Sequence, residues 1–178
     1  MAVGESVRRV GQALAFKREA FVWMDLNDRA TGDALVLVVL TRLLIMLGLG
    51  FGLLGLATSA SGIDILFRSL LNAAVFWLVY SGITYLAARY LLDGSGSFAT
   101  ILRISGFAYP TLLLLLVTIR IFDNGTIAFV VASLWFLAVV THGVRYESEL
   151  VIERAAVAAV SGLVGWMVVS AILGYGLI

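Results

Sequence analysis

The chain has 178 residues, of which 62% are hydrophobic and only 13% charged, with a net charge of +1. Soluble domains carry roughly a quarter of charged residues, so this composition excludes an ordinary water-soluble domain and predicts a membrane protein. The absence of cysteine excludes disulfides, thiol nucleophiles and zinc–thiolate sites. No run of basic residues is dense enough to neutralise a series of phosphates, which speaks against nucleic-acid binding.

Residues 1–32 are predicted to form a cytoplasmic N-terminal amphipathic segment. Helical periodicity gathers its apolar side chains on one face: Val3, Val7, Val10, Leu14, Phe21 and Met24. Such a face either lies in the headgroup layer or packs on the protein's own spans, and the sequence leaves both interpretations open. The segment has no continuous apolar stretch of the kind that a cleavable signal requires, so we expect none here.

Five apolar runs make up most of residues 33–178, which we treat as a single transmembrane domain. They are Ala34–Thr58, Ile65–Leu91, Phe98–Phe122, Ile127–Thr141 and Ala155–Ile178. A helix needs about 20 residues to cross the hydrocarbon core, and the fourth run is expected to reach this length by extending into its flanks. The predicted fold is therefore all-α: a polytopic membrane protein with five transmembrane helices and an N-terminal interfacial amphipathic helix.

The distribution of basic residues predicts an orientation. Nine of the twelve lie in the N-terminal tail or flank the gaps after the second and fourth runs. Because cytoplasmic segments are enriched in Lys and Arg, we expect a cytoplasmic N-terminus and, after five crossings, a C-terminus outside the cytoplasm.

Arg42 lies inside the first run, and it is the one charged residue whose position looks costly. If the span began at Asp33, Arg42 would lie roughly 13 Å along it, where a charge costs several kcal/mol. We favour a structural role, in which Arg42 reaches cytoplasmic water or pairs with an acid. The candidate acids are Asp33, Glu149 and Glu153. The alternative is a substrate-binding role in a transport pathway whose polar lining also includes Asn72, Tyr80 and Thr84.

Small residues spaced four apart predict faces where helices approach closely. They are Gly48 with Gly52 and Ala158 with Gly162. The single histidine, His142, precedes three glutamates and could in principle bind a metal or move a proton, but a histidine at a helix end is the commoner arrangement. We predict no catalytic residues, no metal site and no cofactor.

The most specific local pattern begins at the second cytoplasmic turn. Gly94 and Gly96 suit a tight turn, and Ser97 is placed to cap the helix that follows. Pro110, the only proline, is expected to kink the third span because it cannot donate a backbone hydrogen bond.

This stretch resembles the Yip1 family of five-span membrane proteins, particularly its bacterial members. The residues that carry the resemblance are Gly94, Gly96, Ser97, Phe98, Arg103, Gly106, Ala108, Tyr109 and Pro110. The resemblance implies a bacterial inner-membrane protein without catalytic residues. Eukaryotic relatives bind small GTPases through a region with an Asp-Leu-Tyr-Gly-Pro motif; here Asp25 to Asp28 read Asp-Leu-Asn-Asp, which speaks against GTPase binding.

The expected function is that of a non-enzymatic protein that organises the membrane or binds a partner. Its expected partners are the lipid bilayer and either other membrane proteins or a second copy of the chain. The alternative is a small transporter or channel for a solute or lipid.

Overall fold

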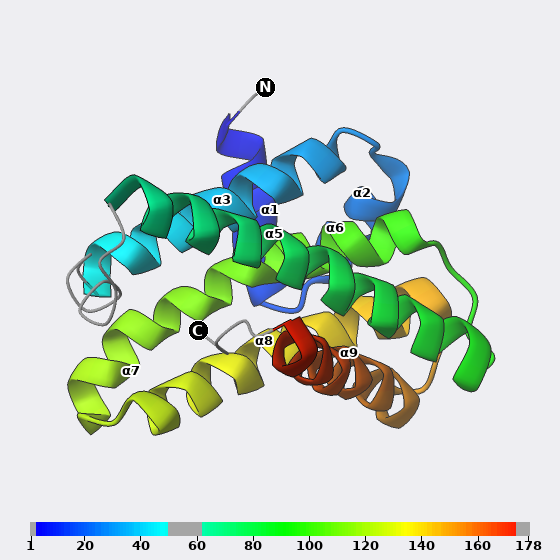
Figure 1. Ribbon diagram of the computed structural model, residues 1–178. Coiled ribbons are helices and arrows are strands. Elements are labelled where there is room, and N and C mark those ends of the chain that lie inside the picture. Colours follow the sequence, from blue (N-terminus) through cyan, green and yellow to red (C-terminus); the bar gives the residue numbers. More distant parts are fainter. Residues whose placement is uncertain (1–2, 50–61, 174–178) are drawn as a thin grey trace.

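The computed structural model describes residues 3–49 and 62–173, and every regular element in these ranges is helical (Figure 1). Five helical spans are long and apolar enough to cross a membrane, which confirms the predicted fold class. They are Ala30–Leu49 (α3), Gly62–Leu91 (α5 and η1), Phe98–Phe122 (α6, η2 and α7), Gly125–Ser148 (α8) and Ile152–Leu173 (α9). Gly52 and the predicted end of the first run at Thr58 lie outside the described residues.

The fourth span extends into its flanks, as predicted. The apolar run Ile127–Thr141 becomes the 24-residue helix Gly125–Ser148 (α8). Asn124 caps this helix, because its side-chain oxygen accepts from the amides of Thr126 and Ile127.

The second and third spans each contain a segment that departs from α-helical geometry. In the third, Phe98–Ala108 (α6) and Leu114–Phe122 (α7) are separated by the 3₁₀ turn Tyr109–Leu113 (η2), which contains Pro110. Proline cannot continue the α-helical hydrogen bonds, and the Thr111 hydroxyl donates to the carbonyl of Ala108 at 2.8 Å. In the second span, Gly62–Leu86 (α5) ends in the π-helical turn Ala87–Leu91 (η1).

The N-terminal segment forms two helices, Val3–Leu14 (α1) and Arg18–Leu26 (α2). The break falls at Phe16, whose φ of 57° lies in the left-handed region. Ala13, Phe21 and Met24 are buried, and α2 contacts α6 and α8. Of the two interpretations of the apolar face, these contacts correspond to packing on the spans.

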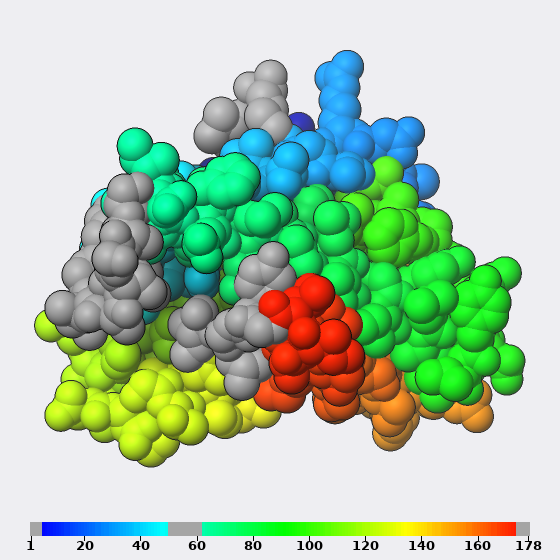
Figure 2. All heavy atoms as spheres, viewed as in Figure 1, coloured from blue at the N-terminus to red at the C-terminus, as the bar shows by residue number. Residues whose placement is uncertain are grey.

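The main core extends over α2, α3, α5, α6, α8 and α9, and polar side chains also join α5 to α6. The Trp77 indole donates to the Leu102 carbonyl at 2.8 Å, and the Ser81 and Ser105 hydroxyls lie 2.6 Å apart. These bonds satisfy polar groups that lipid could not. The outer faces of the spans are apolar; in the space-filling view α5 lies between α3 and α9 (Figure 2).

Glycines lie where two helices meet at short distance. A methyl group added at Gly162 on α9 would collide with Thr84 and Tyr80 on α5, and one at Gly48 on α3 would meet Leu116 on α7. Ala158 is fully buried one turn before Gly162. The absence of a side chain is therefore what allows α5 and α9 to pack here.

We expect Gly162→Ala to lower the free energy of unfolding by about 1–3 kcal/mol, because the added methyl overpacks the α5–α9 contact. Thermal unfolding of the detergent-purified protein measures the change. Gly82→Ala is the matched control, because nothing lies within 4 Å of its added methyl. The control should leave stability unchanged or raise it by up to about 1 kcal/mol. Equal losses in the two variants would contradict this account of the packing.

Candidate functional site

One end of the bundle, which we call the polar end, is formed by α2, the turn 92–97 and the α8–α9 connection around Glu149. In Figure 1 the turn after η1 marks this end on the right, and the α7–α8 turn marks the opposite end on the left.

The turn 92–97 is held by bonds to both neighbouring spans. The Gly94 amide donates to the Ala88 carbonyl at 2.8 Å, and the Ser95 amide to the Ser148 carbonyl at 3.1 Å. Gly96 has a φ of +102°, a conformation that favours glycine. At Ser97 the amide donates to the Glu147 carboxylate at 2.7 Å. The α7–α8 turn at the opposite end has no comparable set of cross-links among the described residues.

Ser97 caps α6, as the sequence indicated. Its hydroxyl oxygen accepts from the Thr100 amide at 3.1 Å. Phe98, the first residue of α6, is exposed, and its ring lies 6.0 Å from that of Tyr85.

Arg103 holds the α2–α3 connection against α6. Its guanidinium donates to the carbonyls of Met24 and Asp25 at 2.9 and 3.2 Å, to the Thr31 hydroxyl at 2.8 Å and to the Asp28 carboxylate at 2.7 Å. We call these five residues the Arg103 clamp. Arg103 is only 5% exposed, so its charge is buried. All three of its guanidinium nitrogens donate hydrogen bonds to this connection.

A second bond strengthens the same junction. The Thr100 hydroxyl donates to the Asp25 carboxylate at 3.0 Å, one turn of α6 before Arg103. Thr100 and Arg103 of α6 therefore engage the carboxylates of Asp25 and Asp28. Sequence reasoning identified Arg103 but not its partners, because they lie 72 to 79 residues earlier in the chain.

The remaining residues of the family-like pattern lie elsewhere. Gly106 faces Ala34 of α3, where a methyl group would collide, and Pro110 lies in η2. Tyr109 lines a cavity within the bundle. The pattern thus serves several separate places in the fold and does not form one site.

His142 lies on α8, with its Nδ1 2.9 Å from the carbonyl of Ala138 and its ring 4.6 Å from that of Phe16. Within the described ranges, no three His, Asp or Glu side chains are placed to hold a metal ion. The observed contacts give His142 a role in packing the α1–α2 connection against α8.

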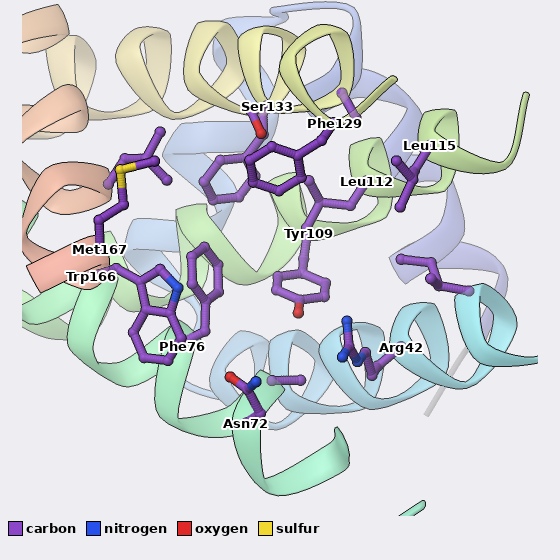
Figure 3. A pocket seen from close by; sticks show the side chains of 15 residues that line it. Arg42, Asn72, Phe76, Tyr109, Leu112, Leu115, Phe129, Ser133, Trp166 and Met167 are labelled. Carbon is purple, nitrogen blue, oxygen red and sulfur yellow. The ribbon is translucent and has the colours of Figure 1, made fainter. Parts of the chain in front are cut away.

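Arg42 lines a partly open cavity of about 80 Å³ between α3, α5, η2, α7, α8 and α9 (Figure 3). Its Nε donates to the Ser69 hydroxyl at 2.7 Å. The predicted pairing with an acid is wrong for the described residues, since Asp33, Glu149 and Glu153 form no ion pair with Arg42. Asp33 instead accepts from Ser6 at 2.8 Å.

The four residues proposed to line a transport pathway do not lie together. Arg42 and Asn72 line the cavity, whereas Tyr80 and Thr84 are fully buried against Gly162. Most of the other lining residues are aromatic or aliphatic.

No family model, curated protein or solved structure matches this chain. The resemblance to the Yip1 family therefore depends on the residues named above.

We expect Arg103→Leu to release the α2–α3 connection, because four hydrogen bonds are lost and two backbone carbonyls lose their donor. Stability should fall by about 3 kcal/mol. Hydrogen exchange of the amides of residues 24–31 measures the release, which should exceed any change in α9.

Asp28→Asn is the control for this experiment. The Asp28 side chain is fully exposed, so its loss of charge should have a small effect, and Arg103 keeps its other acceptors. If the two variants raised exchange equally, the ion pair rather than the full set of bonds would hold the connection.

Proposed function

We propose that this protein is a non-enzymatic integral membrane protein that binds a partner protein, and thereby organises the membrane, through its polar end. The Arg103 clamp is the observation that carries this proposal. It fixes α2 and the start of α3 in a defined position against α6. A surface held in this way is pre-organised, which lowers the entropic cost of binding.

The charges that remain accessible at the polar end support the same proposal. These charges are of both signs: the basic residues Lys17, Arg18, Arg29 and Arg145 are exposed, and so are the acidic residues Glu19, Asp93 and Glu149. Two of these arginines flank one aromatic ring: the guanidinium carbons of Arg18 and Arg145 lie 5.9 and 5.7 Å from the Tyr146 centroid. Arginine and tyrosine are enriched at protein interfaces, and an acidic group on the partner would suit the cluster of Arg18, Arg145 and Tyr146.

The proposal includes an orientation and a family. A cytoplasmic polar end agrees with the distribution of Lys and Arg, and would expose this surface to cytoplasmic proteins. Membership of the Yip1 family, and with it a bacterial inner membrane, is supported by the pattern from Gly94 to Pro110. Asp25 and Asp28 are engaged by Thr100 and Arg103, which supports the expectation that this segment does not bind a GTPase.

A small transporter or channel is the second candidate, and Arg42 at the cavity is the observation that favours it. Against it, the bonds of Trp77 and Ser81 fasten α5 to α6 beside the cavity. A pathway through the bundle would have to break buried hydrogen bonds in a medium that offers no replacement.

We expect a photo-crosslinking amino acid at Glu149 to form one defined adduct in native membranes, and the same group at Asp123 to form none. The two positions are matched, because both are exposed turn residues with positive φ, at opposite ends of the bundle. Arg103→Leu should abolish the adduct at residue 149. Equal adducts at both positions would contradict a partner at the polar end.

Reconstituted vesicles test the second candidate directly. We expect the purified protein to carry no more solute or lipid across the bilayer than protein-free vesicles do. Flux above that level, abolished by Arg42→Ala but not by Arg120→Ala, would replace the binding proposal with transport.

A further inference from the structure

We propose that the cavity beside Arg42 binds the head and first chain carbons of an anionic amphiphile, a molecule with one carboxylate or phosphate group and an apolar chain. This goes beyond the proposed function, because it places a small-molecule site within the spans. The argument rests on the unsatisfied donors around the cavity and on the apolar character of its remaining lining.

The Arg42 guanidinium has more N–H donors than hydrogen-bond partners. A guanidinium carries five N–H groups, and in the described part of the chain the one hydrogen bond from Arg42 is that of Nε to Ser69. Arg42 lies roughly 18 Å along α3 from Ala30, at membrane depth, where an unpaired charge costs several kcal/mol. Its side chain is half-buried, so its two terminal nitrogens remain open to a ligand.

Two further polar groups face the same place. Tyr109 is only 4% exposed, and its hydroxyl has no hydrogen bond within the described residues. Figure 3 shows this hydroxyl pointing toward the side of the cavity where Arg42 and Asn72 lie. The hydroxyl is therefore free to donate to an anion that pairs with Arg42. The side-chain amide of Asn72, which also lines the cavity, supplies another donor.

The remainder of the lining selects for an apolar group next to the anion. Phe76, Phe129 and Trp166 are among the aromatic residues that surround the cavity. Its volume of about 80 Å³ is smaller than the roughly 150 Å³ cavity that holds a benzene ring, so a whole acyl chain does not fit. The protein therefore recognises the head and the adjoining carbons, and the rest of the chain lies in the bilayer.

Quenching of Trp166 by a dibrominated stearate tests the proposal. The protein in neutral-detergent micelles is titrated at alkaline pH, where the acid is ionised, and in parallel with the methyl ester, which keeps the chain but loses the charge. Trp166→Phe identifies the part of the signal that comes from the cavity. We expect the acid to bind about tenfold or more tightly than the ester, because hydrogen bonds to a charged group are stronger than those to a neutral one.

Three variants locate the interaction. Arg42→Leu should reduce binding of the acid to the level of the ester. Arg120→Leu is the matched control, because it removes an exposed arginine that does not line the cavity, and it should change nothing. Ala73→Leu, which keeps Arg42 and fills part of the cavity, should weaken acid and ester alike. Thermal unfolding shows whether each variant is folded, and Tyr109→Phe replaces Arg42→Leu if that variant is not.

Nanodiscs distinguish the two sources of the anion. Stronger quenching of Trp166 by brominated phosphatidylglycerol than by brominated phosphatidylcholine, without displacement by free stearate, identifies a bilayer phospholipid. Displacement by free stearate identifies a fatty acid. Equal quenching by acid and ester and by the two phospholipids, or an equal effect of Arg42→Leu and Arg120→Leu, would overturn the proposal.

Discussion

The hydrocarbon core of a membrane offers polar groups no hydrogen bonds, and the arrangement of these helices follows from that constraint. Trp77 and Ser81 on α5 find their partners on α6, and Thr118 donates to carbonyls of its own helix. Such bonds require helices that approach closely. Gly106 lies against Ala34 of α3 and the Trp77 indole of α5, and Gly162 lies against α5, so their missing side chains allow this approach.

Two arginines meet this constraint differently. Arg103 is buried and donates to a carboxylate, a hydroxyl and two backbone carbonyls, so its charge is compensated within the fold. Arg42 is half-buried and, among the described residues, donates to one neutral acceptor, Ser69. The first arrangement is what a structural charge requires. The second leaves donors of Arg42 available. We therefore assign the protein-binding surface to the end fixed by Arg103, and the amphiphile site to the cavity that Arg42 lines.

The spans were predictable because their signal is local: apolar length alone identified all five, and the flanks of Ile127–Thr141 supplied what that run lacked. Capping by Ser97 and the irregular turn at Pro110 were likewise local. The Arg103 clamp was not predictable, because its partners are far away in sequence. Nor was the break at Phe16, since helical periodicity continues across it. Arg42 was recognised by its charge, but its neighbour Ser69 lies on a different helix.

The account depends on an odd number of spans that place the polar end and the α7–α8 turn on opposite sides of one bilayer. Because the chain contains no cysteine, single cysteines introduced at Ser95, Glu149 and Asp123 can be labelled with a membrane-impermeant maleimide in cells and in inverted vesicles. We predict that residues 95 and 149 react only from the cytoplasmic side and residue 123 only from the other side. Labelling of residues 95 and 123 from the same side would contradict the five-span arrangement.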